Sequence, residues 1–247
     1  CYRGAQGERN YGMRSPEDLV AEAKWLQETY EIDFLGFPDD NFAVDVRRIR
    51  ALVEAFGSLN RLRWGTHTRL DEAADERAEL MAKAGCVYIG FGAESASARV
   101  LERMNKGGVI LRPRGAKSNV LERINGFDFP TTMVKGIRNS REVGIHANCT
   151  WIMAYPGEEL SDLQTSVAFI LWQEGLMTQG LTSGSLAYKQ ARDAVNRKMF
   201  IATAYPGTAM FKDSACRQIL TNNFGISFQM NGAPTADDAR RDYILEL

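Results

Sequence analysis

The sequence lacks the features that mark several large classes of protein. No apolar run reaches the roughly 18 residues that cross a bilayer, and the formal net charge is only −1. Neither a membrane nor a nucleic acid is therefore expected as a partner, and we expect a cytoplasmic protein. No G-x-G-x-x-G follows an expected strand and no G-x-x-x-x-G-K-[ST] occurs, so the fingerprints of dinucleotide-binding and P-loop proteins are missing.

Potential metal ligands are also sparse. The chain contains four scattered cysteines, without a CxxC pair, at Cys1, Cys86, Cys149 and Cys216. Scattered cysteines in a large chain are more often buried thiols than a disulfide framework, so we expect the last three to be buried. The two histidines are too few for a His-rich metal site. His146 is expected at a strand start, and His67, near a strand tip, is a candidate for a substrate contact.

The sequence does contain an alternation of short apolar runs with amphipathic helical patterns. The runs span residues 32–37, 62–67, 87–91, 145–153 and 199–203, and each is typical of a strand in a parallel sheet. The helix after the run 145–153 is expected to bury Leu160, Leu163, Val167 and Ile170. Strand–helix alternation predicts an α/β fold with right-handed crossovers, and polar tips at the strand ends favour a partial barrel over a flat sheet.

The stretch from Gly85 to Lys106 organises the prediction, because Glu94 stands at the carboxyl end of its strand. Ligand sites of α/β folds lie at this end of a parallel sheet. Ser95 or Ser97 can cap the helix that follows. On position alone, Glu94 either binds a ligand or only helps to cap this helix.

A near-copy of this stretch occurs further along the chain. Residues 92–95 and 100–105 read GAES and VLERMN, and residues 115–118 and 120–125 read GAKS and VLERIN, with Lys117 in place of Glu94. We interpret residues 107–130 as a surface insertion that holds a local duplication; chance similarity between two helix starts is the alternative. Residues 175–197 are interpreted as a second insertion. The predicted organisation is a barrel over residues 1–220 and a C-terminal loop and helix over 221–247.

Six motifs stand at strand tips or in their expected loops. In chain order they are Cys1-Tyr2-Arg3-Gly4, Arg14-Ser15-Pro16-Glu17, Phe37-Pro38-Asp39-Asp40-Asn41-Phe42, Gly92-Ala93-Glu94-Ser95 with Met104-Asn105-Lys106-Gly107, Tyr155-Pro156-Gly157-Glu158, and Tyr205-Pro206-Gly207-Thr208. Together they resemble the motifs of the radical S-adenosylmethionine (SAM) enzymes. Within that superfamily the likeness is to the cobalamin-associated branch of methylases and cyclases.

The resemblance implies a partial (β/α)6 TIM-like barrel whose first strand is not in this chain. It also implies a [4Fe–4S] cluster and SAM at the top of the barrel, with reductive cleavage of SAM to a 5′-deoxyadenosyl radical. The reaction expected is methylation or cyclisation of an unactivated carbon in a small-molecule substrate. An electron donor such as flavodoxin or ferredoxin would be a partner.

The resemblance also implies roles for individual residues. Cys1 matches the third cysteine of a CxxxCxxC loop and is the expected metal ligand, followed by the cofactor-binding aromatic Tyr2. The residues expected near the SAM amino group are Asp39, Asp40 and Asn41. Those expected at its ribose or methionyl end are Glu94 and Ser95. Those expected on the adenine side are Tyr155, Pro156, Gly157, Tyr205 and Pro206. No catalytic residue is assigned.

The sequence departs from the pattern of the family at its start. The first two cluster cysteines and an upstream cobalamin-binding domain are not in these residues. One cysteine cannot hold a four-iron cluster, so we expect this chain by itself to be inactive. Two alternatives stay open. One is a degenerate barrel that serves as a binding module, and the other is a (β/α) barrel lyase that holds a divalent metal through Asp39, Asp40 and Glu94.

Overall fold

The computed structural model describes residues 12–57, 59 and 62–203, with single residues at 210, 218 and 222. The chain divides into two compact units, and every helix and strand that the structure describes lies in the unit Arg14–Ile201. The motifs Cys1-Tyr2-Arg3-Gly4 and Tyr205-Pro206-Gly207-Thr208, and the residue Cys216, lie outside the described residues. Of the predicted C-terminal loop and helix, residues 221–247, only residue 222 is described.

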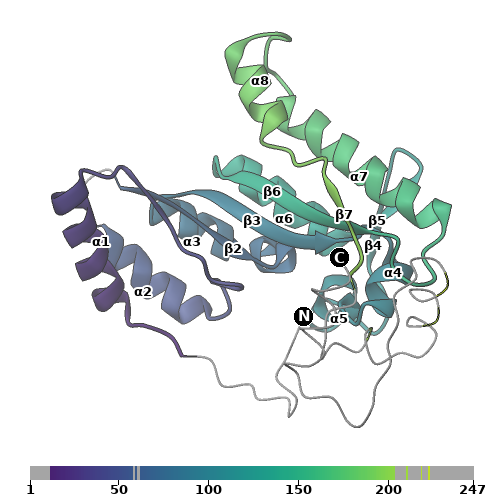
Figure 1. The fold of residues 1–247 in the computed structure, drawn as a ribbon, viewed down its shortest axis with the longest axis horizontal. Helices are drawn as coiled ribbons and strands as arrows, with labels where there is room; N and C mark the ends of the chain where they lie inside the picture. The colour runs from purple at the N-terminus through teal and green to yellow at the C-terminus, as the bar shows by residue number, and fades with distance from the viewer. Residues whose placement is uncertain are drawn as a thin grey trace. The chain divides into compact units, whose positions relative to one another are not determined.

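Five parallel strands form one sheet in the order β1-β2-β3-β6-β7 (Figure 1). The strands are β1 Phe34–Gly36, β2 Arg63–Thr68, β3 Cys86–Glu94, β6 His146–Met153 and β7 Met199–Ile201. Each one coincides with an apolar run in the sequence, and each neighbouring pair is parallel. The predicted α/β fold with a parallel, half-barrel sheet is therefore confirmed.

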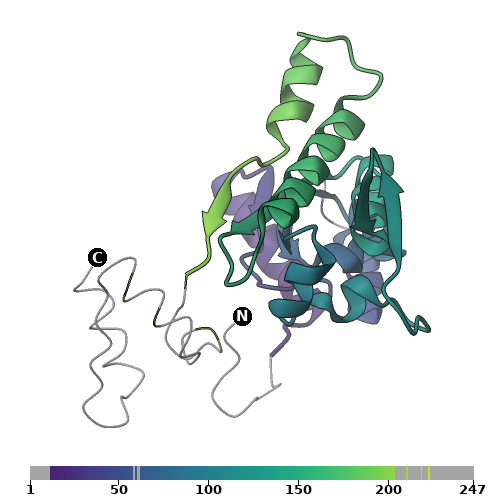
Figure 2. The ribbon, with the colours of Figure 1, turned by 90° about the vertical axis from the view of Figure 1, so that its right-hand side faces the viewer.

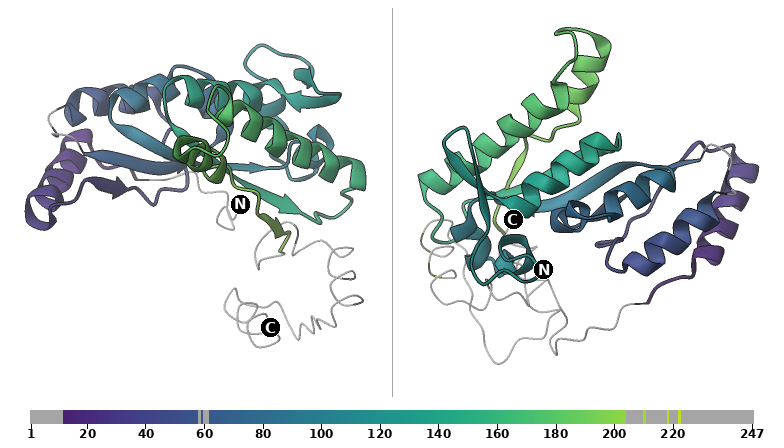
Figure 3. Two further views of the ribbon diagram at one scale, coloured as in Figure 1. Left: turned by 90° about the horizontal axis from the view of Figure 1, so that it is seen from above. Right: turned by 180° about the vertical axis from the view of Figure 1, so that it is seen from behind.

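A row of helices covers one face of this sheet (Figure 3). The helices of the row are α1 Pro16–Tyr30, α2 Val46–Phe56, α3 Arg77–Lys83, α6 Thr131–Glu142 and α7 Leu160–Thr178. Each contacts the next in this order, and the short 3-10 helix η1, Leu70–Ala74, packs against α6. Among the described helices, none combines the length and the apolar character needed to cross a membrane.

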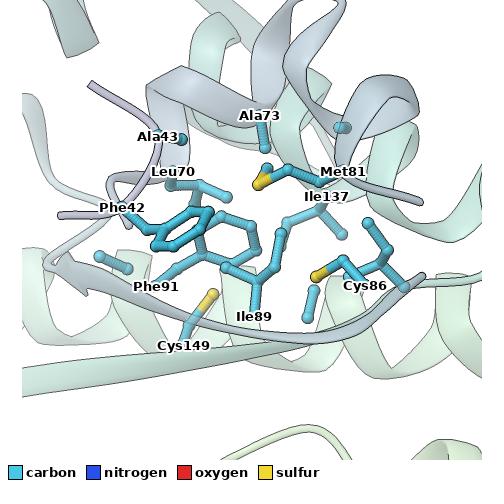
Figure 4. Close-up of a cluster of buried hydrophobic side chains, with 14 of the residues drawn as sticks. Phe42, Ala43, Leu70, Ala73, Met81, Cys86, Ile89, Phe91, Ile137 and Cys149 are labelled. Carbon is cyan, nitrogen blue, oxygen red and sulfur yellow. The ribbon is translucent and has the colours of Figure 1, made fainter. Parts of the chain in front are cut away.

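The core lies between the helices and the sheet. Figure 4 shows Ile89, Phe91 and the two thiols Cys86 and Cys149 pointing from the strands toward the helices. Both cysteines are free and buried, as predicted. Burial raises the pKa of each thiol to about 12, so both stay protonated and unreactive at neutral pH.

The stripe predicted for the helix after β6 is wrong in part. In α7, Leu160 is 70% exposed and Val167 is 41% exposed, although Ile170 is buried as predicted. The buried side of the helix carries Phe169 and Ile170 together with three polar side chains, Asp162, Ser166 and Gln173. Gln173 donates to the carbonyl of Ala147 on β6 at 2.9 Å. Because such residues are hydrogen-bonded inside the protein, hydropathy alone assigned the wrong face.

Residues 107–130 form more than the surface segment expected. They contain α5 Gly107–Leu111 and an antiparallel hairpin of β4 Leu121–Ile124 and β5 Phe127–Pro130, which lies beside α6 and α7 (Figure 2). Ile110, Leu111 and Phe129 are buried in the core. The second copy of the repeat is therefore a strand, whereas the first is the helix α4 Ala98–Arg103. Residues 175–197 contain the end of α7 and the helix α8 Leu186–Asp193, which buries none of its residues.

Candidate functional site

The face of the sheet that points away from the helices is lined by glycines and rings. In the register of the sheet, Gly65 on β2 lies opposite Gly36 on β1 and Tyr88 on β3. Two positions further along β2, His67 lies opposite Gly90 on β3. A Cβ on Gly90 would lie 2.4 Å from the His67 ring, and one on Gly65 would lie 3.1 Å from Tyr88. The glycines thus let the rings lie flat on the sheet.

These rings border an open cavity of about 450 Å³. Its lining residues are Phe34, Gly36, Phe37, Pro38, Gly65, Thr66, His67 and Tyr88. The volume falls in the range of small-molecule sites. His67, the candidate for a substrate contact, is one of its walls, whereas His146 is exposed at the start of β6, as predicted.

Glu94 lies where the sequence predicted, at the carboxyl end of β3. Its backbone is left-handed, with φ of +63°, a conformation that costs a non-glycine residue energy and clusters at functional sites. A Cβ on Gly92 would lie 3.2 Å from Glu94 Oε1, so the carboxylate folds back over Gly92. Lys106 donates through Nζ to this oxygen. No described residue bonds the other oxygen, Oε2, which leaves it available to a ligand.

The polar segment after β1 divides into exposed and engaged side chains. Asp39 and Asp40 are exposed. Asn41 donates through Nδ2 to Glu72 Oε1 at 3.1 Å, and its Oδ1 lies 2.6 Å from the Thr68 hydroxyl oxygen. The segment therefore presents two exposed carboxylates, of which Asp39 attracts the charge of Arg48, while the amide of Asn41 is held by β2 and η1.

Ser95 and Ser97 have separate roles at the start of α4. Ser97 caps the helix by accepting from the backbone N–H of Val100, and it donates to Asp162 Oδ1 at 2.6 Å. Ser95 has no exposed surface, and its hydroxyl lies 3.2 Å from that of Ser166 on α7. Glu94 thus lies between β3 and a helix start that is held to α7.

An ion pair fixes the same helix start to α7. Arg99 donates to both carboxylate oxygens of Asp162. Burial alone would raise the pKa of Asp162, but the hydrogen bonds from Arg99, Ser97 and the backbone N–H of Glu159 outweigh it, and the pKa of Asp162 is lowered. Arg69, directly after β2, binds Asp71 at 2.9 and 3.2 Å.

The turn after β6 packs against the end of α4. The Tyr155 hydroxyl donates to the Arg103 carbonyl at 3.3 Å. Gly157 has φ of +78°, which favours glycine, and a Cβ there would lie 2.6 Å from the Arg103 guanidinium, so another residue would also displace this side chain. Glu158 Oε1 is buried without a hydrogen-bond partner among the described residues, and burial raises the pKa of Glu158. This turn therefore has an acceptor that a ligand donor could satisfy.

The described residues contain no group of three or more His, Cys, Asp or Glu side chains that could hold a metal ion. Asp39, Asp40 and Glu94 are therefore not gathered into the divalent-metal site that a barrel lyase would need. The described thiols, Cys86 and Cys149, are buried among the core side chains and do not fit a cluster.

Sequence reasoning gave no role to several residues of this site. Lys106 stood inside a quoted motif, but its pairing with Glu94 was not foreseen. No sequence pattern indicated that Thr68 and Glu72 hold Asn41, because they lie 27 and 31 positions away from it along the chain. Glu158 also stood in a quoted motif without a role.

Comparisons with known proteins identify the family. The profile of the Radical SAM superfamily matches residues 1–170. An uncharacterised methyltransferase from Pyrococcus horikoshii is 22% identical over 225 residues, which cover 89% of this chain and 40% of the relative. Cytidylyl-2-hydroxyethylphosphonate methyltransferase from Streptomyces wedmorensis is 30% identical over 161 residues, which cover 62% of this chain and 26% of the relative. The chain thus spans less than half the length of either relative.

The fold also matches a solved structure. The cobalamin-dependent SAM radical enzyme OxsB, with aqua-cobalamin bound, aligns with a TM-score of 0.61 at 16% identity, over 91% of this chain and 34% of that chain. Likeness at this identity shows the fold alone. The parallel sheet and its row of helices are the partial TIM-like barrel expected from the motifs.

Proposed function

Because the chain belongs to the radical SAM superfamily, we propose that it forms the barrel of an enzyme that binds SAM beside a [4Fe–4S] cluster and cleaves it reductively. When bound, the two cofactors supply a 5′-deoxyadenosyl radical, which can start methylation or cyclisation at an unactivated carbon. The observation that carries the proposal is Glu94. Its carboxylate is held at the strand end by Gly92 and Lys106, with one oxygen left for a ligand.

The described residues fit SAM in three places. The carboxylate of Glu94 can accept from a ribose hydroxyl or from the methionyl amino group. Asp39 and Asp40 present further carboxylates to the amino group from the segment after β1, two strands away from β3. The turn Tyr155-Pro156-Gly157 offers backbone groups to the adenine, and the orphaned Glu158 Oε1 can accept from its amino group.

The remaining assignments are proposals for residues outside the described part of the chain or buried within it. We propose Cys1 as a cluster ligand, with Tyr2 beside it, and Tyr205 and Pro206 on the adenine side. Ser95 is proposed to act through its hydrogen bond to Ser166, which fixes the backbone beneath Glu94.

Methyl transfer and cobalamin are further proposals, supported by the names of the relatives. Two are methyltransferases, and OxsB is cobalamin-dependent. Cobalamin would be held by an upstream domain, electrons would come from a donor such as flavodoxin or ferredoxin, and a cytoplasmic location suits both. The cavity beside His67 is proposed to receive part of a small-molecule substrate.

The test is anaerobic iron–sulfide reconstitution of the full-length protein. Iron content, absorbance of the thiolate-to-iron band and release of 5′-deoxyadenosine from SAM on reduction are measured, with Cys1→Ala as the matched variant. We expect about four irons per chain and SAM cleavage in the native protein, and neither in the variant. A native protein that takes up no iron would overturn the proposal and leave the binding-module interpretation.

A further inference from the structure

The segment that follows β1 is attached to β2 at two points. The backbone N–H of Phe37 donates to the Gly65 carbonyl at 2.8 Å, and that of Phe42 donates to the His67 carbonyl at 3.0 Å. Between these points the chain leaves the sheet as Pro38-Asp39-Asp40-Asn41. Its conformation there depends on side chains, because no strand pairing fixes it.

A buried carboxylate supplies the missing support. Glu72, in η1, is only 8% exposed. Its Oε1 accepts from Asn41 Nδ2 at 3.1 Å, and its Oε2 accepts from the Thr68 hydroxyl. The Thr68 oxygen also lies 2.6 Å from Asn41 Oδ1 and accepts from the backbone N–H of Ala43 at 3.3 Å. The single proton of the Thr68 hydroxyl can go to Glu72 Oε2 or to Asn41 Oδ1, but not to both. The orientation of the Asn41 side chain is therefore fixed by its donation to Glu72 and by its contact with Thr68.

Arg77 lies beside this carboxylate and links it to Ala43. Its guanidinium lies 3.9 Å from Glu72 Oε1 and donates to the Ala43 carbonyl at 3.0 Å, and it also binds Asp75 at 2.8 Å. A buried carboxylate is costly unless it is paired and hydrogen-bonded. Here each partner of Glu72 belongs to, or touches, the segment that carries Asp39 and Asp40.

We propose that Glu72 is a positioning residue for SAM: by fixing Asn41 and Thr68, it holds residues 38–43 so that Asp39, Asp40 and the main-chain carbonyls meet the methionyl amino group. The inference rests on the proposed function. It assigns Asn41 an inward, supporting role and leaves the ligand contacts to its two acidic neighbours. Glu72 itself does not touch the cofactor.

The test compares two substitutions of Glu72 in the full-length protein with reconstituted cluster. Glu72→Ala removes both acceptors. Glu72→Gln keeps the network, because its amide oxygen can accept from Asn41 and its NH2 can donate to the Thr68 oxygen, which frees the hydroxyl proton for Asn41 Oδ1. The matched control is Glu76→Ala. Glu76 is an exposed carboxylate between η1 and α3, and it pairs with Arg50 at 2.6 Å.

Two readouts are measured for each protein: amide hydrogen exchange of residues 38–43 and the Kd for SAM. For Glu72→Ala we expect faster exchange in this segment, unchanged exchange in β3, and a Kd about tenfold higher, the loss typical of hydrogen bonds to a charged group. Glu72→Gln is expected to stay within about threefold of the native Kd, and Glu76→Ala to leave both readouts unchanged.

The possible results distinguish a failure of the positioning role from a failure of the proposed function on which it rests. Faster exchange in Glu72→Ala with an unchanged Kd would overturn the positioning role alone, and so would unchanged exchange. Equal weakening by Gln and Ala would mean that the charge acts directly, not the hydrogen bonds. If the native protein itself binds no SAM, the proposed function fails, and this inference fails with it.

Discussion

The two copies of the repeat have nearly the same residues and different structures. Residues 100–105 read VLERMN and end the helix α4, whereas residues 120–125 read VLERIN and form β4. Leu101 has no exposed surface, but Leu121, at the matching position, is 41% exposed. Only the first copy carries the acidic residue that faces the candidate site. A repeat in sequence is therefore not a repeat in structure or in function here.

The residues before each copy explain one half of the difference. Ser97 caps α4 and binds Asp162, which fixes the helix start to α7. The second copy has only Asn119 between Ser118 and Val120, so the spacing that places a cap is missing. A short helix without a cap or tertiary anchor is marginal.

The residues after each copy explain the other half. Asn125 and Gly126 have φ of +50° and +88° and join β4 to β5 as a two-residue turn. Both central residues of a type I′ turn need positive φ, and Asn-Gly is its preferred pair. In the first copy Asn105 is followed by Lys106, which instead reaches Glu94. The flanking residues, and not the residues that the two copies share, therefore determine whether a copy forms a helix or a strand.

The largest difference between the copies is expected for their shared leucine. Leu101→Ala opens a cavity in the core and should lower the free energy of unfolding by about 2–5 kcal/mol. Leu121→Ala removes a side chain that is largely exposed and should cost about 0.5 kcal/mol. Denaturant unfolding of both variants measures the contrast. Equal costs would show that the second copy is packed as tightly as the first.

The next contrast concerns the residue that differs between the copies. Glu94→Gln removes a charged acceptor at the strand end and should slow SAM cleavage about 10–100-fold in the reconstituted full-length protein, the loss of a charged hydrogen bond. Lys117→Gln, at the matching and exposed position, should leave the rate unchanged. The yield of 5′-deoxyadenosine is the measurement. A full rate in Glu94→Gln would remove this residue from the site.

The sequence predicted the parts of the fold and of the site that depend on local pattern. Apolar runs located the five strands, and the break after Phe91 placed Glu94 at a strand end. The hairpin was predictable as well, because Asn125-Gly126 between alternating residues is a strong turn signal.

Contacts between distant residues were not predictable in the same way. Lys106 reaches Glu94 only because Asn105 turns the chain back with φ of +55°. Glu72 meets Asn41 across 31 positions. The buried stripe of α7 depends on hydrogen bonds to Asp162 and Ser166 from another element, and hydropathy contains no information about such partners.

A smaller, pH-dependent effect is expected from Asp162, the residue of α7 that binds Ser97 and Arg99 at the start of α4. Because its hydrogen bonds lower the pKa of Asp162 in the folded protein, the ionised carboxylate stabilises the fold above the unfolded pKa of about 3.9. That stability is lost as the pH falls through the folded value. Asp162→Asn should therefore cost about 1–3 kcal/mol at pH 7 and progressively less on acidification.

Unfolding between pH 2 and pH 7 measures this dependence. Glu122→Gln is the matched control in the second copy, where Glu122 pairs with the partly exposed Arg138 at 2.8 Å and surface pairs contribute little. A constant difference between native protein and Asp162→Asn across the range would contradict the role assigned to the ion pair.

The smallest effect is expected from a substitution in the turn Asn125-Gly126, which joins β4 to β5 after the second copy. Gly126→Lys gives the second copy the residue that follows Asn105 in the first, so the two segments become more alike in sequence. Open space surrounds the Cβ position of Gly126, so the cost comes from the backbone alone, about 1 kcal/mol for a side chain at positive φ. Ser118→Lys, an exposed position of the same segment, controls for the added charge. Thermal unfolding and hydrogen exchange measure whether β4 keeps its pairing with β5 in Gly126→Lys. If it does, the missing helix cap and the packing of Phe129 are what keep residues 121–124 in a strand. If the amides of β4 become unprotected, the turn itself determines that these residues form a strand and not a helix.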